Sequence, residues 1–153
     1  MIIRRGDLED LDALVANRME FLDLVRTDPS TAADDGLAAV THAFMKEHLQ
    51  DETLVVWLAE EEGKIVSTAM VCYYRQLPNN SNTTGRMGYI QNVYTLADYR
   101  RRGLASELLN RIIRDAGERK AGRLMLDATD MGQPVYEKLG FILMKHEMSY
   151  KLA

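Results

Sequence analysis

One short stretch of this 153-residue chain carries residues suited to holding an anion. Three consecutive arginines, Arg100 to Arg102, are followed by Gly103, and Ala105 lies two positions further on. An apolar run precedes the stretch and an amphipathic run follows it, which predicts a strand, a tight basic loop and a helix. Because a helix begins with unpaired backbone N–H groups and the positive end of its dipole, small residues there let an anion approach closely. The pattern therefore predicts a pyrophosphate site.

Two familiar phosphate motifs are missing from the sequence. There is no Gly-x-x-x-x-Gly-Lys-Ser/Thr, which excludes a Walker-type phosphate loop. No Gly-x-Gly-x-x-Gly follows a strand pattern, which excludes the usual dinucleotide fingerprint.

Composition limits the classes of protein to consider. With 46% hydrophobic and 27% charged residues, the chain fits one globular domain spanning residues 1–153. A net charge of −4 argues against a general nucleic-acid partner, and no apolar run approaches the length needed to span a membrane. The single cysteine, Cys72, cannot form a disulfide within the chain. Together with the lack of a signal-peptide pattern, this predicts a cytoplasmic protein.

The elements that must position the basic loop follow from hydrophobic periodicity and turn residues. Asp7 is expected to cap the first helix, and the Asp28-Pro29-Ser30 segment is expected to end it. A charged turn at 60–64 predicts a β-hairpin, and continuous apolar runs in its strands predict a sheet covered on both faces. The polar connection at 76–87 is expected to lie over a site. In chain order we predict a strand at 1–5, helices at 8–24 and 31–50, strands at 53–59, 65–74 and 88–96, a helix at 104–116, a strand at 123–128, a helix at 131–139, and closing strands at 141–144 and 147–152.

A second motif, Tyr136-Glu137-Lys138-Leu139-Gly140-Phe141, follows the fifth predicted strand. Combined in this order with Arg100-x-x-Gly103-x-Ala105, it resembles the GCN5-related N-acetyltransferase (GNAT) family, and the resemblance covers nearly the whole chain. It implies an α/β (α+β) fold: one GNAT-like domain with a central mixed, mostly antiparallel sheet that splays between the fourth and fifth strands. About four helices are expected to flank this sheet.

The resemblance also implies acetyl-CoA as co-substrate, without a metal. The pantetheine arm is expected to pair with the fourth strand, and the pyrophosphate to sit on the backbone N–H groups at 101–106. One or two of the three arginine side chains are expected to reach the phosphates. Relatives often carry an asparagine before the last helix; here Thr129 or Asp130 could make that contact, or Asp130 could cap the helix. The expected cofactor-binding residues are Val93, Tyr94, Thr95, Arg100, Arg101, Arg102, Gly103, Leu104, Ala105, Ser106 and Thr129.

Tyr136 is the expected catalytic residue, because the matching tyrosine of the family donates a proton to the departing CoA thiolate. A phenol with an ordinary pKa of ~10 is protonated at neutral pH. The alternative is that Tyr136 only packs the helix and hydrogen-bonds the sulfur. No carboxylate lies on the fourth strand to act as a base, although Gln91 and Asn92 could orient a water or bind substrate. Glu20 could project toward the acceptor or be a solvated helix residue.

These expectations describe an N-acetyltransferase that moves an acetyl group directly to a primary amine of a small molecule or peptide. The acidic protein suits a cationic acceptor. The alternative is a non-catalytic module that binds or senses acyl-CoA. A homodimer formed through a sheet edge is compatible with either. No two histidines have metal-ligand spacing with a carboxylate or Cys72, so no metal site is expected.

Overall fold

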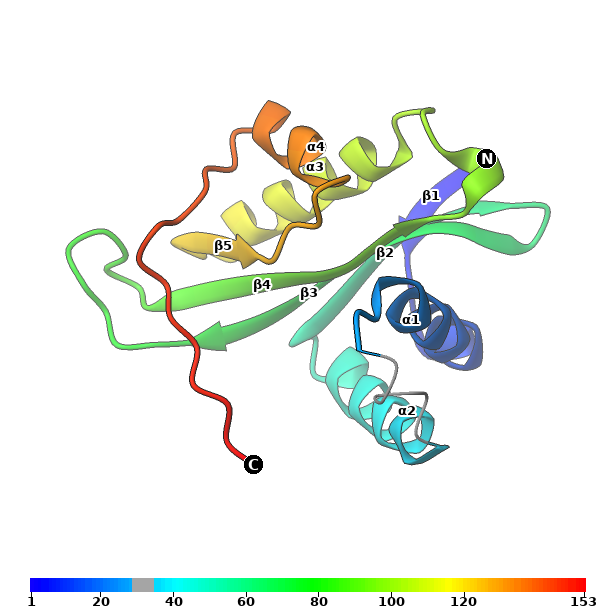
Figure 1. Ribbon diagram of the computed structural model, residues 1–153, viewed down its shortest axis with the longest axis horizontal. Coiled ribbons are helices and arrows are strands. Elements are labelled where there is room, and N and C mark those ends of the chain that lie inside the picture. The colour runs from blue at the N-terminus through cyan, green and yellow to red at the C-terminus, as the bar shows by residue number, and fades with distance from the viewer. Residues whose placement is uncertain (29–34) are drawn as a thin grey trace.

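The structure is a computed structural model that describes residues 1–28 and 35–153. Its helices and strands follow the predicted order as far as the last helix (Figure 1). The expected break at Pro29 and Ser30 and the first residues of the expected second helix, 31–34, lie outside the described residues. The strands are β1 (Ile2–Arg5), β2 (Leu54–Glu61), β3 (Lys64–Arg75), β4 (Arg86–Thr95) and β5 (Arg123–Leu126). The α-helices are α1 (Leu11–Val25), α2 (Asp35–Gln50), α3 (Leu104–Glu118) and α4 (Gln133–Lys138), with short 3₁₀ turns at Leu8–Asp10 and Ala97–Tyr99.

The five strands form one sheet in the order β1-β2-β3-β4-β5. Neighbouring strands run antiparallel, except that β5 lies parallel to β4. Residues 87–90 of β4 pair with the whole of β5, which then ends at Leu126 while β4 continues to Thr95. The predicted mixed, mostly antiparallel sheet with a split between its fourth and fifth strands is therefore confirmed.

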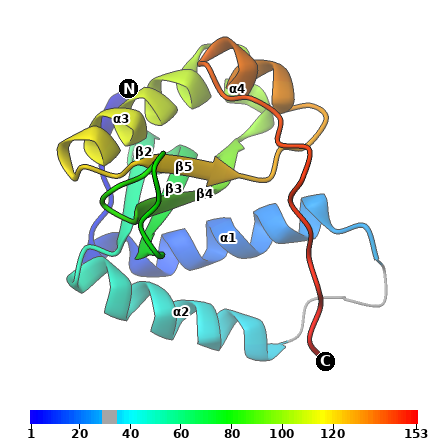
Figure 2. The same ribbon diagram turned by 90° about the vertical axis from the view of Figure 1, so that its left-hand side faces the viewer.

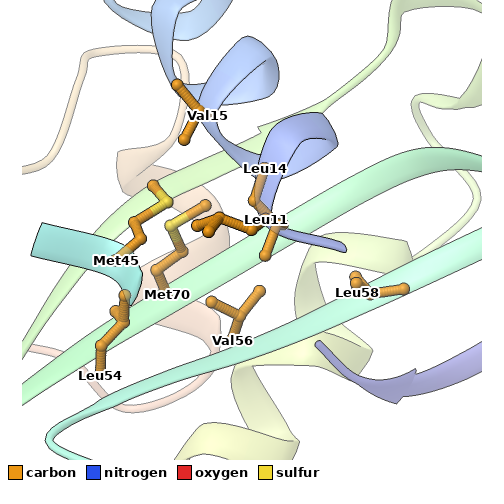
Figure 3. Close-up of a cluster of buried hydrophobic side chains, with 8 residues drawn as sticks. All are labelled: Leu11, Leu14, Val15, Met45, Leu54, Val56, Leu58 and Met70. Atoms are coloured by element: carbon orange, nitrogen blue, oxygen red, sulfur yellow. The ribbon is translucent and has the colours of Figure 1, made fainter. Parts of the chain in front are cut away.

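Helices cover both faces of the sheet, as the continuous apolar strands predict (Figure 2). In β2, Val56 packs toward α1 and α2, whereas its neighbour Val55 packs toward α3. Of the apolar residues on α2, Met45 is buried, but Val40 and Phe44 stay exposed. No helix among the described residues is both long and apolar enough to cross a membrane. The cluster between the sheet and α1 and α2 comprises Leu11, Leu14, Val15, Met45, Leu54, Val56, Leu58 and Met70 (Figure 3).

Local signals fix two of the predicted boundaries. The Asp7 carboxylate accepts a hydrogen bond from the backbone N–H of Glu9, and the Asp10 carboxylate accepts one from the N–H of Asp7. This capping box starts the 3₁₀ turn that leads into α1. The β2–β3 hairpin turns at Glu62 and Gly63, which both have positive φ, the conformation that suits a two-residue turn between twisted strands.

The two closing strands expected at 141–144 and 147–152 are not formed. The chain leaves α4 as an extended coil and ends on the side of the sheet where α1 and α2 lie (Figures 1 and 2). Phe141 still donates its N–H to the Tyr136 carbonyl and packs on the Tyr136 ring. Beyond it the apolar side chains are solvent-exposed. Alternating apolar residues suit a strand, but a strand also needs a neighbour that satisfies its backbone groups, and these residues pair with none in the described chain.

A β-bulge interrupts the pairing of β3 and β4 beside Ala69, where Asn92 adopts a left-handed φ of 55°. A buried polar network holds this bulge against α1. The Asn17 Oδ1 atom accepts hydrogen bonds from the Thr68 hydroxyl at 2.9 Å and from the Asn92 side-chain amide at 2.8 Å. The network fixes where β4 turns away from β5, and so sets the shape of the sheet's split end.

Replacing Asn17 by alanine is expected to lower the free energy of unfolding by about 1–3 kcal/mol, because the Thr68 hydroxyl and the Asn92 amide lose a buried acceptor. Urea titration followed by circular dichroism measures this change. Asn110→Ala, at an exposed position of α3, is the control and should change stability by less than about 0.5 kcal/mol. Equal effects of the two substitutions would contradict a stabilising role for the network.

Candidate functional site

A groove of about 1150 Å³ opens where β4 and β5 part. Its walls are the free half of β4, the first turn of α3, the segment from β5 to α4, and one side of α1. All but one of the predicted cofactor-binding residues line it, and Tyr136 lines it as well. The connection at 76–87 contributes no lining residue among those described, so the expectation that it covers the site is wrong. Its Asn82 side chain instead donates to the carbonyl of Arg86, at the β4 end remote from the basic loop.

The basic loop ends in an uncapped helix start. Arg101 and Gly103 both adopt left-handed backbone conformations, with φ of 60° and 76°. Gly103 is the N-cap residue of α3, and no side chain caps this helix. The first backbone bond of the helix runs from the Glu107 N–H to the Gly103 carbonyl at 3.0 Å. The N–H groups at 104–106 precede that bond and line the groove, which makes them donors for an anion.

The three arginines have different surroundings. Arg100 donates from Nε to the Thr95 carbonyl at 3.0 Å and lines the groove with Arg101. Arg102 does not line it: its guanidinium donates to the Asp98 carbonyl and stacks over the Tyr99 ring, 5.0 Å from the centroid. Two of the three charges are thus placed to reach an anion at the helix start.

The free part of β4 forms a wall of backbone. Val93, Tyr94 and Thr95 line the groove, and β4 has no pairing with β5 beyond Ile90 in the described chain. The Tyr94 hydroxyl donates to the Glu20 carboxylate at 2.7 Å, and burial together with that carboxylate raises the pKa of Tyr94 to about 12. Unpaired strand edges bind extended ligands through main-chain hydrogen bonds, so this wall suits an amide-containing arm.

Tyr136 lies on α4, half-buried at the groove. Its ring packs edge-on against Phe141, with 5.9 Å between centroids. Gly132 leaves room for it, since a Cβ there would come within 3.1 Å of the ring. Burial raises the pKa of the Tyr136 phenol above its ordinary value. Before α4, the Thr129 hydroxyl oxygen accepts from the Gly132 N–H at 3.1 Å and closes the turn that leads into the helix. Gly132 is the N-cap residue of α4 and no described side chain caps this helix, so the alternative of an Asp130 cap is wrong.

The predicted acceptor residues separate into two groups. Gln91 lines the groove, with its Oε1 atom 3.8 Å from the Cys72 sulfur. Asn92 also borders the groove, but its side chain is buried in the network with Asn17. Glu20 does not line the groove and acts on it only through Tyr94.

Two charged residues that the sequence pattern did not single out also line this part of the groove. Asp127 follows β5 directly, and its carboxylate accepts from the Tyr89 hydroxyl at 2.8 Å. Burial and this carboxylate raise the pKa of Tyr89 to about 12. Arg18 reaches the groove from α1. The sequence does contain a signal for each of these residues. Arg18 is a charged residue on the otherwise apolar side of its helix, and Asp127 stands directly after a strand, where side chains can reach a groove.

Among the described residues, no group of three or more histidine, cysteine or acidic side chains could hold a metal ion. The described residues that line the groove offer backbone donors, the phenol of Tyr136, the carboxylate of Asp127 and several cationic side chains.

Comparison with known proteins identifies this architecture. Residues 19–141 match the acetyltransferase (GNAT) family. A predicted acetyltransferase from Clostridium acetobutylicum, solved with acetyl-CoA, is 31% identical, with a TM-score of 0.90 over 98% of this chain and 95% of that one. A GCN5-related N-acetyltransferase from Ralstonia eutropha JMP134 is 25% identical, with a TM-score of 0.81 over 99% and 97%.

More distant structures share the fold. The aminoglycoside N-acetyltransferase AAC(6')-Iy in complex with CoA is 19% identical, with a TM-score of 0.75 over 99% of this chain and 93% of that one. No curated protein matches the sequence. The extent of the family match and the similarity to the Clostridium acetobutylicum structure show that the chain belongs to the GNAT family and is an acetyltransferase that uses acetyl-CoA.

Proposed function

We propose that this acetyltransferase moves the acetyl group of acetyl-CoA directly to a primary amine of a small molecule or peptide. The observation that carries the proposal is the continuous groove from the start of α3, along the free half of β4, to Tyr136. A pyrophosphate, a pantetheine arm and a thioester come in that order along acetyl-CoA, and the groove offers an anion site, a strand edge and a proton donor in the same order.

The residues fit acetyl-CoA. We assign the pyrophosphate to the N–H groups at 101–106 with Arg100 and Arg101, and the pantetheine amides to the backbone of Val93, Tyr94 and Thr95. Gly103 keeps the approach to the first turn of α3 open, because no atom lies within 4 Å of the position that a Cβ would occupy. Thr129 lines the groove and holds the turn before α4. Arg102 supports the loop from outside the groove by packing on Tyr99.

Bound acetyl-CoA supplies an acetyl group activated as a thioester. The chain's own residues then orient the acceptor and manage protons. Backbone N–H groups near Val93 to Thr95 polarise the thioester carbonyl. Tyr136 holds a proton at its phenol oxygen for the departing thiolate, and its raised pKa keeps that proton in place at neutral pH. Its packing between Gly132 and Phe141 limits the positions that the ring can take.

On the acceptor side we assign Gln91 to contact with the acceptor and Asp127 to its amine. An ionised carboxylate has about four acceptor sites, and the Tyr89 hydroxyl uses one of them. The remaining sites suit an ammonium group and the removal of its proton. Asn92 and Glu20 contribute by holding β4 and Tyr94 in place.

A thiol-release screen tests the proposal. The protein is mixed with acetyl-CoA and panels of amines, polyamines, amino acids and peptides, and free CoA is measured against controls that lack the acceptor. Acceptor-dependent release with an N-acetylated product is the expected result. Absence of acceptor-dependent release with every panel, or release without an N-acetylated product, would contradict transfer to an amine.

We further propose a cytoplasmic homodimer. A reducing compartment is supported by the single cysteine, which has no partner thiol in the chain. The dimer is supported by the open edge of β5 and by the exposed apolar side chains that follow α4, which a second copy would cover. These side chains are Ile142, Leu143, Met144, Met148, Tyr150 and Leu152. Size-exclusion chromatography with light scattering should give twice the mass of one chain, and a single-chain mass would contradict the dimer.

A further inference from the structure

Arg18 is a cation without a carboxylate partner in the described chain. The other half-buried arginines form ion pairs: Arg4 with Asp10 and Glu60, Arg111 with Glu107, and Arg119 with Asp115. None of the ion pairs among the described residues includes Arg18. Within the described chain its guanidinium makes one hydrogen bond, a long one of 3.5 Å to the side-chain Oδ1 of Asn92 at the bulge.

The surroundings of Arg18 make this arrangement costly for the protein alone. Burial disfavours the guanidinium cation and lowers its pKa. The neighbouring Cys72 does not compensate, because burial raises the pKa of its thiol and leaves it neutral at physiological pH. A buried charge without a partner is normally eliminated or paired. Here the guanidinium faces the groove, so a bound molecule can provide the missing anion.

The position of Arg18 separates it from the CoA phosphates. It contacts Asn92, near the start of the free part of β4, and lies beside Cys72 of β3, which packs on the face of the sheet that α1 covers. The anion site at the helix start begins only at Arg100, after β4 has ended. This separation leaves the acceptor, and not the CoA phosphates, as the bound molecule whose anion Arg18 can reach.

We propose that Arg18 binds a carboxylate of the acceptor, so that the acceptor is an amine carrying a carboxylate, such as a free amino acid. This inference rests on the proposed transfer to an amine. Asp127 would attract the amine and Arg18 the carboxylate, a pair of opposite charges that suits a zwitterion. The same guanidinium repels a polycation, which reverses the expectation of a cationic acceptor drawn from the net charge of the chain.

The first test compares amino acids with the amines that differ from them only by lacking the carboxylate: phenylalanine with phenethylamine, and leucine with isopentylamine. The readout is the ratio of kcat/KM within each pair in the thiol-release assay. The ratio should favour the amino acid. Arg18→Gln should reduce it about 10- to 100-fold, because a charge-assisted contact is lost, and Arg18→Lys should restore part of it. Arg114→Gln, at an exposed position of α3, is the control and should not change it.

The second test needs no acetyl transfer. The only cysteine, Cys72, lies next to Arg18, and its thiolate displaces iodide from either iodoacetate or iodoacetamide to form a thioether. The two reagents differ in the negative charge of the carboxylate. Both reagents react with the same Cys72 thiolate, so any change that the loss of Arg18 causes in the fraction of thiolate affects both rates equally. The ratio of the two alkylation rates therefore measures only the attraction of Arg18 for the carboxylate of iodoacetate. Arg18→Gln should lower the iodoacetate-to-iodoacetamide ratio about tenfold.

Three outcomes would overturn the proposal: amines preferred over their amino acids, an Arg18→Gln variant that retains the wild-type selectivity ratio, or an unchanged alkylation ratio. An Arg18→Gln variant whose dissociation constant for CoA rises as much as its selectivity falls would also overturn it, since the anion would then belong to CoA. Failure of every amine and amino acid in the transfer assay would contradict the proposed function, whereas the alkylation ratio would still decide the role of Arg18.

Discussion

Replacing Tyr136 by phenylalanine is expected to lower kcat about 10- to 1,000-fold, with little change in the dissociation constant for acetyl-CoA. The substitution removes the phenol proton but keeps the ring that packs against Phe141 and fills the space beside Gly132. Loss of one positioned proton donor accounts for an effect of this size. Steady-state thiol release gives kcat, and calorimetric titration with CoA gives the dissociation constant.

The control for this substitution is Tyr150→Phe, at an exposed tyrosine near the end of the chain. It should leave both constants unchanged. The pH dependence provides a second check. Because burial raises the pKa of Tyr136, its phenol keeps its proton throughout the neutral range and beyond its ordinary value of ~10. Any decrease of kcat between pH 8 and 9 would thus come from another group. A Tyr136→Phe variant with wild-type kcat would exclude Tyr136 as the acid.

Replacing Gly103 by valine is expected to weaken acetyl-CoA binding at least about tenfold. Gly103 has a φ of 76°, a conformation that a β-branched residue adopts only at a cost of about 1–3 kcal/mol. The backbone there would relax, and the N–H groups of the first turn of α3 would no longer converge on the pyrophosphate. The valine side chain would also occupy the space that is open around Gly103. Calorimetric titration with CoA measures the loss.

A matched control exists in the same chain. Gly63, in the β2–β3 turn, has the same φ of 76°, and no atom lies within 4 Å of the position that a Cβ would occupy there. Gly63→Val should therefore lower the free energy of unfolding by about 1–3 kcal/mol, comparably to Gly103→Val, but leave CoA binding unchanged. If the two variants bound CoA equally well, the loop at Arg100 to Ser106 would not be the pyrophosphate site.

The position of the loop at Arg100 to Ser106 between a strand and a helix could be predicted from the sequence because its determinants are local. Small residues at a helix start, a preceding strand and a run of arginines lie within a few positions of one another, and the helix that they begin has a clear apolar stripe. The role of Arg102 could not be predicted, since its contact with Asp98 and Tyr99 depends on the 3₁₀ turn before it. The sequence of three consecutive arginines does not show which of them points away from the groove.

The part of the groove that we assign to the acceptor could not be predicted in the same way because its contacts join distant parts of the chain. Tyr89 meets Asp127 only through the parallel register of β4 and β5, and Arg18 meets Asn92 only because α1 crosses the split end of the sheet. The prediction of two closing strands was wrong for a related reason. Alternating apolar residues at 141–152 resemble a strand, but pairing depends on an edge that the local pattern does not specify.

Residues of α1 contact two different parts of the structure. Asn17 binds the β-bulge, whereas other residues of the same helix line the groove. Asn17 maintains the geometry of β4, on which acetyl transfer to any acceptor depends. Four residues that follow it on α1 line the groove: Arg18, Phe21, Leu24 and Val25. If the proposed acceptor site is correct, substitutions at these four positions should alter acceptor choice more than acetyl-CoA binding. This helix is therefore a place where new specificities can evolve, and a compact target for a library that keeps Asn17 fixed.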